Sequence, residues 1–182
     1  MQVTKTNLEG VLIFEPKVFR DARGHFFETF QLERYKEYGI PEKFVQDNLS
    51  YSIKNVVRGL HYQLEKPQGK LVHVSKGCVL DVVVDIRKHS KTFGQTFCLE
   101  LSDENHKQLY IPPGFAHGYC TLSDTATFIY KCTDYYHPPA ERGIIWNDPD
   151  LNIKWPVHHA VLSPKDMEYK RLKDVPREDL PL

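Results

Sequence analysis

Three side chains between Arg58 and Lys70 could together bind an anion and move a proton. Arg58 and His61 stand three residues apart, and Lys70 follows directly after Gly69. Arginine and lysine can hold a phosphate or an enolate oxygen, whereas histidine titrates near neutral pH and can accept or donate a proton. This spacing predicts a site for an anionic ligand that undergoes proton transfer. A hairpin with a solvated basic rim and a structural histidine is the alternative for this stretch alone.

Two later segments carry further candidate groups. The run IPPGFAHGY at 111–119 contains prolines and a glycine that separate two expected strands, and it places His117 at the start of the second. In the run FIYKC at 128–132, Tyr130 is expected on the strand face opposite Ile129 and Lys131. Near the C-terminus, Ser163 is followed by proline, which is typical of a helix start, and Asp166 would there complement the helix dipole.

The elements that must position these groups are mainly strands. From about residue 44 to 133, short apolar stretches alternate with turn signals at spacings near ten residues, which favours a sandwich or barrel over βαβ units. In the run 78–86, Asp81 and Asp85 share one face of the expected strand. The first expected helix covers 31–38. The proline-rich segment 138–156 is expected to wrap around the barrel.

The overall composition limits the class of protein. A chain of 182 residues is long enough for one domain with a sizeable core, and no repeat or low-complexity tract divides it. We therefore expect a single domain over residues 1–182. The 24 basic and 24 acidic residues give a net charge of zero, which argues against a general nucleic-acid or membrane-surface binder. Any anionic ligand must therefore be bound by a local cluster.

The four cysteines, Cys78, Cys98, Cys120 and Cys132, form neither a zinc nor a redox motif. All lie in apolar-rich segments, where free cysteine packs as a small hydrophobe; a Cys120–Cys132 bridge is the alternative. The N-terminal residues lack the features of a signal peptide, and no run approaches the ~18 apolar residues of a membrane span. A cytoplasmic location is the resulting expectation.

Five motifs in order make the chain resemble the dTDP-4-dehydrorhamnose 3,5-epimerase family. The resemblance extends from about residue 5 to 168 and is carried by RGLHYQ (58–63), QGKLV (68–72), DVVVDIR (81–87), IPPGFAHG (111–118) and WNDP (146–149). It implies an all-β fold, a cupin-type double-stranded β-helix (jelly roll) with a few short helices, and a homodimer. It also implies an isomerase of dTDP-rhamnose biosynthesis, a route to lipopolysaccharide and cell-wall polysaccharide, with no metal and no cofactor.

The substrate that the resemblance implies is dTDP-4-dehydro-6-deoxy-D-glucose, and the product is dTDP-4-dehydro-L-rhamnose. The 4-ketone acidifies the hydrogens on C3 and C5. Inversion needs a base, an acid on the opposite face and a positive group near the enolate oxygen. By resemblance, His61 is the base, and Asp166 is the carboxylate that orients it. Tyr130 matches the proton donor, and Lys70 matches the cation beside the C4 oxygen.

The resemblance also assigns substrate-binding residues. Arg23 and Arg58 are expected at the diphosphate, because a planar guanidinium suits phosphate oxygens, and Tyr136 is expected to stack on the thymine ring. Lys70 would contact the sugar. The other positions that match nucleotide- or sugar-contacting residues are Glu28, Gln46, Asp47, Asn48, His117, Glu141 and Lys165. Without the family match, Arg23 and Glu28 would be interpreted as a surface ion pair of little energy.

Three other functions stay open on the sequence alone. A mono-epimerase that acts at C3 or at C5 of a related nucleotide sugar would keep the same base and acid. A metal-dependent cupin typically uses an H-x-H pair with a glutamate and a later histidine; here only His61, His117 and Glu65 could gather around a metal. A non-catalytic nucleotide-sugar binding module would have lost the base or the acid, whereas both are present.

Overall fold

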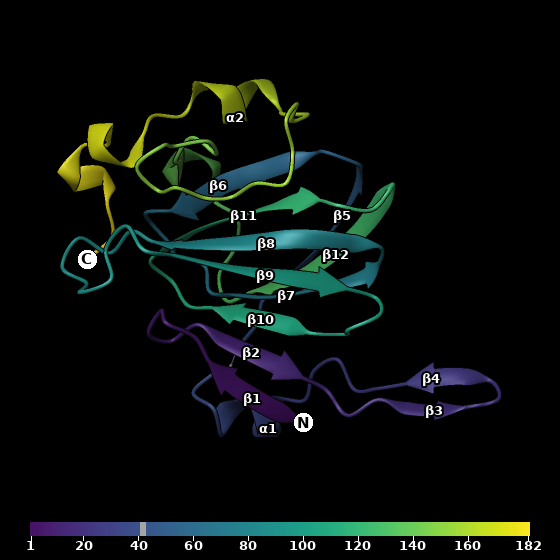
Figure 1. Ribbon diagram of the computed structural model, residues 1–182. Helices are drawn as coiled ribbons and strands as arrows, with labels where there is room; N and C mark the ends of the chain where they lie inside the picture. Colours follow the sequence, from purple (N-terminus) through teal and green to yellow (C-terminus); the bar gives the residue numbers. More distant parts are fainter. Residues whose placement is uncertain (41–42) are drawn as a thin grey trace.

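Two antiparallel β-sheets face each other in the computed structural model, which describes residues 1–40 and 43–182 (Figure 1). One sheet has six strands in the order β1-β2-β10-β7-β12-β5, and the other has five in the order β13-β6-β11-β8-β9. A separate two-stranded hairpin, β3–β4, projects from the body. The regular secondary structure of the described residues is nearly all strand, and the expected jelly roll with a few short helices is confirmed.

The strands are β1 (Gln2–Lys5), β2 (Leu12–Glu15), β3 (Phe19–Asp21), β4 (Gly24–Phe26), β5 (Gln46–Ile53), β6 (Val57–Gln63), β7 (Lys70–Lys76), β8 (Cys78–Asp85), β9 (Thr96–Ser102), β10 (Gln108–Ile111), β11 (Phe115–Thr121), β12 (Thr125–Cys132) and β13 (Glu141–Gly143). The helices are α1 (Leu32–Lys36), α2 (Pro164–Glu168) and the 3₁₀ turns η1 (Pro138–Ala140), η2 (Leu172–Asp174) and η3 (Arg177–Asp179). None of these helices is long and apolar enough to cross a membrane, over the residues described.

The main hydrophobic core lies between the two sheets. Alternate residues of each strand point inward, and Val72 of β7, Val83 of β8, Leu101 of β9 and Phe128 of β12 are all buried there. The four cysteines are free, Cys120 and Cys132 being buried. Because Cys120 lies on β11 and Cys132 on β12, in different sheets, the alternative of a bridge between them is wrong.

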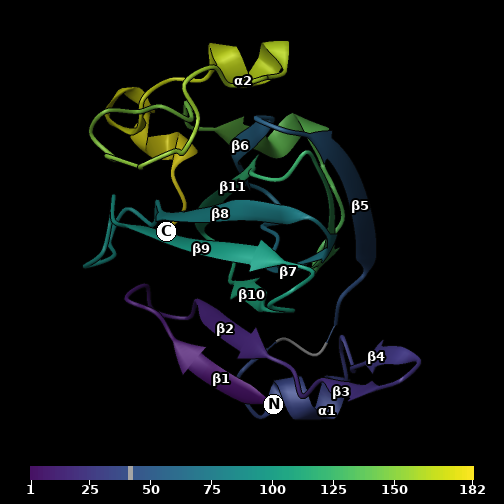
Figure 2. The same ribbon diagram turned by 45° about the vertical axis from the view of Figure 1, so that its right-hand side comes forward.

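The outer faces of the two sheets are covered to different extents. The five-stranded sheet is covered by the C-terminal segments, since Leu151 and Leu172 pack on Val82 of β8. This confirms that the segment 138–156 wraps around the barrel, and Figure 2 shows α2 above β6. The six-stranded sheet is covered at one end, where Tyr35 of α1 stacks on Phe14 of β2 with 4.7 Å between ring centroids.

The segment from Leu64 to Gly69 crosses from one sheet to the other. Strand β6, which carries His61, belongs to the five-stranded sheet, whereas β7, which begins with Lys70, belongs to the six-stranded sheet. The interpretation of 57–70 as a hairpin is therefore wrong. The crossing is what allows Lys70 and His61 to approach one cavity from facing sheets.

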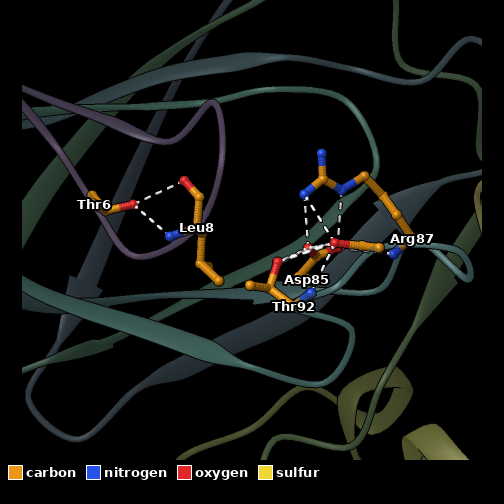
Figure 3. A network of polar contacts seen from close by, with 6 residues as sticks. Thr6, Leu8, Asp85, Arg87 and Thr92 are labelled. Carbon is orange, nitrogen blue, oxygen red and sulfur yellow. Dashed lines mark hydrogen bonds and ion pairs between the residues drawn. The ribbon is translucent and has the colours of Figure 1, made fainter.

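Asp85, in the motif DVVVDIR, organises the loop between β8 and β9 (Figure 3). It is fully buried and accepts hydrogen bonds from Arg87 Nη2 at 2.7 Å, Ser90 Oγ at 2.6 Å and Thr92 Oγ1 at 2.6 Å. Burial by itself raises the pKa of Asp85, but these donors outweigh it and hold the pKa below its usual value. This part of the motif is thus structural.

Candidate active site

A cleft of about 240 Å³ opens between the two sheets and is also lined by residues of α2. Both sheets and the helix contribute side chains to it. The expected catalytic residues His61, Lys70, Tyr130 and Asp166 all line this cleft, together with Ser50, Arg58, His117, Gly118, Tyr119, Phe128, Ser163 and Lys165. Residues up to 116 positions apart in the sequence, from Ser50 to Asp166, therefore meet at one place.

His61 and Asp166 form a short hydrogen-bonded pair. His61 Nε2 and Asp166 Oδ1 lie 2.5 Å apart, and Asp166 is only 3% exposed. Ser163 caps α2 as the sequence predicts, because its Oγ accepts a hydrogen bond from the backbone N–H of Asp166 at 3.2 Å. Burial raises the pKa of Asp166, but the hydrogen bond from His61 outweighs it, so the pKa lies below its usual value. The carboxylate stays ionised and fixes the orientation of the imidazole.

An irregularity at Gly59 directs Arg58 and His61 to the same cleft. In a regular strand, residues three apart point to opposite faces, yet both line the cleft. Gly59 has φ of +118°, and the pairing of β6 with β11 shifts register opposite it. A Cβ atom at Gly59 would lie 2.6 Å from the Cα of Gly118, so no other residue fits this approach.

Tyr130 and Lys70 enter the cleft from the six-stranded sheet. They lie on the neighbouring strands β12 and β7, where Lys70 pairs in register with Cys132 and Tyr130 pairs with Val72. Their side chains are therefore diagonal neighbours on the inner face. Burial raises the pKa of Tyr130 to about 12, so the phenol is protonated at neutral pH. The imidazole of His61 thus faces a phenol and an ammonium across the cleft.

A chain of polar contacts borders the cleft. Gln46 Nε2 donates to Asn48 Oδ1 at 3.0 Å, and Gln46 Oε1 accepts from the backbone N–H of Tyr136 at 2.8 Å. The hydroxyl of Tyr136 donates to Glu141 Oε2 at 2.7 Å, and Lys165 Nζ pairs with the same oxygen. Tyr136 leaves half of its side chain exposed. Five of the expected binding residues are thus connected along one rim.

His117 is paired with a buried carboxylate. Its Nε2 lies 2.9 Å from Oδ2 of Asp81, which is fully buried on the neighbouring strand β8. The second oxygen of Asp81 has no hydrogen-bond partner among the described residues. The sequence placed Asp81 on a strand face without a role. Only the pairing of β8 with β11 shows that it orients His117.

Three of the expected binding residues lie neither in this cleft nor along its polar rim. Arg23 is on the β3–β4 hairpin and pairs with Asp21 at 2.5 Å. Glu28 pairs with Arg34 at 3.0 Å, so the interpretation of Arg23 and Glu28 as partners is wrong. Asp47 points to the outer face of β5.

Asp47 is held there by Lys131 Nζ at 3.0 Å. The alternation along β5 explains its position, because Gln46, Asn48 and Ser50 are the residues that point inward. Of the residues 46–48, the two amides therefore lie on the inner face of β5, whereas Asp47 lies on its outer face.

The metal-dependent alternative needs His61, His117 and Glu65 in one place. His61 is bound to Asp166 and His117 to Asp81, while the side chain of Glu65 is 79% exposed and lies 3.9 Å from His137. Over residues 1–40 and 43–182, no group of three or more histidine, cysteine or acidic side chains is arranged to hold a metal ion. The arrangement therefore does not favour that alternative.

The model of the family described as dTDP-4-dehydrorhamnose 3,5-epimerase matches residues 5–174. This chain belongs to that family. The enzyme so described from Shigella flexneri is 53% identical over 96% of this chain and 97% of its own length. The Legionella pneumophila 3,5-epimerase, solved in complex with dTDP-4-keto-L-rhamnose, is 52% identical with a TM-score of 0.96, over 99% of this chain and 97% of that one.

A more distant relative is named for epimerisation at one carbon. The dTDP-4-dehydrorhamnose 3-epimerase of Streptomyces niveus is 38% identical over 92% of this chain and 82% of its own length. The family resemblance is thus confirmed, and this member of the family is an enzyme, an epimerase.

Proposed function

We propose that this epimerase inverts C3 and C5 of dTDP-4-dehydro-6-deoxy-D-glucose to give dTDP-4-dehydro-L-rhamnose, within one domain and without a cofactor. The observation that supports this best is the His61–Asp166 pair on one wall of the cleft with Tyr130 and Lys70 on the other. Inversion by proton transfer needs a base and an acid on opposite faces of the sugar ring. The two facing sheets supply such a pair.

In the proposed reaction, His61 removes the hydrogen from a carbon next to the 4-ketone. Asp166 stabilises the imidazolium that forms and keeps the ring in one orientation. Lys70 stabilises the negative charge that develops on the C4 oxygen. Tyr130 then donates its proton to the opposite face of the carbon, and the phenolate is a weaker base than the enolate that it quenches. The same steps at the second carbon complete the reaction.

The binding residues would place the nucleotide along the polar rim. Arg58 would hold the diphosphate through its N–H groups. The exposed face of Tyr136 offers a surface on which the thymine ring can stack. The Tyr136–Glu141–Lys165 contacts keep that ring in place.

One comparison favours action at both carbons over action at one. The Shigella flexneri relative, named a 3,5-epimerase, is 53% identical, whereas the relative named a 3-epimerase is 38% identical. A 3,5-epimerase and a 3-epimerase would use the same base and acid. The number of inverted carbons therefore has to be measured.

Proton NMR in deuterium oxide tests the proposal directly. We expect the protein, incubated with dTDP-4-dehydro-6-deoxy-D-glucose, to introduce deuterium at both C3 and C5. We also expect a downstream reductase to trap the L-lyxo product. Exchange at one carbon only would establish a mono-epimerase, and no exchange at either carbon would refute the proton-transfer mechanism for this substrate.

The position of Lys70 predicts a loss of activity at alkaline pH. Burial lowers the pKa of Lys70 below its usual 10.5, although the nearby Cys132, Asp81 and Glu141 oppose this effect. Only the ammonium form stabilises the enolate, so kcat falls at a lower pH than an ordinary lysine would give. Tyr130, with a pKa of about 12, stays protonated over this range. The fall of kcat at alkaline pH then reports the deprotonation of Lys70.

The stability of the fold rises over the same alkaline pH range in which kcat falls. The unfolded chain binds a proton at Lys70 that the folded chain has released, so the free energy of unfolding rises with pH there. Measurements of kcat and of urea unfolding against pH test both trends. Lys70→Arg keeps its charge at all these pH values, so its alkaline limb should move to higher pH. If kcat of Lys70→Arg falls at the same alkaline pH as in the unchanged enzyme, another group causes the fall.

We also propose that the functional unit is a homodimer. The outer face of the edge strand β5 exposes Leu49, Tyr51 and Ile53, at 65%, 59% and 54%. An uncovered apolar strand face at a sheet edge favours pairing with a second copy. A binding role for Arg23 would then depend on the partner, because its hairpin projects from the body of the chain (Figure 1) and contributes no residue to the cleft.

The dimer predicts the mass of two chains in light scattering after gel filtration. We expect Tyr51→Glu, which puts a charge in the middle of the exposed strand face, to give monomers. A single-chain mass for the unchanged protein at all concentrations would refute the dimer. The cytoplasmic location stays a prediction from the sequence.

A further inference from the structure

Arg58 is held in place by groups from the opposite sheet. Its Nε donates a hydrogen bond to Ser52 Oγ at 3.1 Å, and its Nη2 donates to the backbone oxygen of Tyr51 at 3.4 Å. Ser52 and Tyr51 lie on β5 of the six-stranded sheet, whereas Arg58 lies on β6 of the five-stranded sheet. Two of the three guanidinium nitrogens are therefore directed to β5, and Nη1 is left for a ligand in the cleft.

Ser52 is itself held by a buried tyrosine. The hydroxyl of Tyr119 lies 3.1 Å from Ser52 Oγ and 2.8 Å from Ser50 Oγ. Tyr119 is 4% exposed and Ser52 is 3% exposed. The ring of Tyr119 stacks on Phe128 with 4.4 Å between the centroids. A buried hydroxyl between two partners cannot turn away without losing a hydrogen bond, so Ser52 offers Arg58 an acceptor in a fixed position.

We propose that Ser52 and Tyr119 are positioning residues for diphosphate binding, which hold the Arg58 guanidinium so that its remaining N–H groups face the phosphates. This inference rests on the proposed role of Arg58. A free arginine side chain loses conformational freedom when a ligand immobilises it, and that loss opposes binding. The bond to Ser52 removes part of this freedom before the ligand arrives, so the affinity for the diphosphate rises.

The same hydrogen bonds also join the two sheets, so a purely structural role is the alternative. The two roles differ in what they affect. A structural contact supports the fold and therefore the binding of every ligand. A positioning contact acts only through Arg58 and only on ligands that carry phosphate. Ser52→Ala and Tyr119→Phe each remove one hydroxyl and keep the rest of the side chain, so both roles can be measured on the same variants.

Isothermal titration calorimetry with dTDP, and NMR titration with thymidine, separate these roles in the full-length protein. We expect Ser52→Ala and Tyr119→Phe to weaken dTDP binding by about five- to tenfold, which lies within the range of one ordinary intramolecular hydrogen bond. Thymidine affinity stays unchanged. In the Arg58→Ala background, Ser52→Ala causes no further loss of dTDP affinity, because the pathway through Arg58 is already absent. With the sugar substrate, KM rises and kcat is kept.

Tyr35→Phe is the matched control. It removes another buried tyrosine hydroxyl, which donates to Gln108 Oε1 at 2.7 Å outside the cleft. We expect it to lower Tm without a change in dTDP affinity. A loss caused by Ser52→Ala that persists without Arg58, or unchanged dTDP affinity in both hydroxyl variants, would overturn the inference.

Arg58→Ala separates this failure from a failure of the proposed function. If Arg58→Ala binds dTDP as the unchanged protein does, the proposed role of Arg58 is wrong, and the inference is refuted with it. If Arg58→Ala weakens binding and Ser52→Ala does not, the inference alone is refuted.

Discussion

We expect His61→Asn to lower kcat by about 10²–10⁴, the usual contribution of a general base. Asparagine cannot accept the proton at neutral pH, but its amide can still donate a hydrogen bond to Asp166. The buried carboxylate thus keeps a partner, and the fold loses little stability. Coupled reduction of the product, followed at saturating substrate, gives kcat. The same sample in deuterium oxide should show no deuterium uptake at C3 or C5 on the time scale of the unchanged enzyme.

His73→Asn is the matched control for this variant. His73 lies on β7, two residues after Leu71, so the two side chains share the outer face of the six-stranded sheet. His73 does not line the cleft. We expect it to keep full activity. If His61→Asn retains activity within tenfold of the unchanged enzyme while it folds normally, His61 is not the base.

Tyr130→Phe should separate proton removal from inversion. The phenol oxygen is lost, but His61, Asp166 and Lys70 remain, so enolate formation continues. We expect net inversion to fall by about 10² or more, while deuterium uptake from solvent survives at one carbon at least. His61 can return a solvent-derived proton to the face from which it took the first, which exchanges the hydrogen without inverting the centre. NMR measures exchange and inversion in one experiment.

Tyr110→Phe controls for the loss of a buried phenol. Burial raises the pKa of Tyr110 to about 12, as it does for Tyr130, but Tyr110 packs with Phe14 and Leu71 away from the cleft. We expect it to leave both exchange and inversion unchanged. Exchange and inversion that fall together in Tyr130→Phe would contradict a role confined to proton donation.

Local signals account for the elements that the sequence predicts well. The strand predicted over 78–86 is found as β8 (Cys78–Asp85), because alternation along a strand is a local property that places Asp81 and Asp85 on one face. Ser163 and Pro164 start α2 as predicted. In the aromatic run 25–30, strand β4 ends at Phe26 although aromatic residues continue. Beyond this strand, Phe27 packs on His106 and Phe30 packs on Tyr35, with 4.7 and 5.0 Å between the ring centroids.

By itself, the sequence determined the strand-rich pattern, the family and the four residues of the proposed catalytic set, because motifs and alternation are local properties. Only the tertiary structure decided that β6 and β7 lie in different sheets, so that His61 faces Lys70 and Tyr130. It also decided that Arg58 and His61 share one cleft, through the irregularity at Gly59, and that Arg23 and Glu28 lie outside it. These features depend on which strands pair, and pairing between distant segments leaves no mark in a local residue pattern.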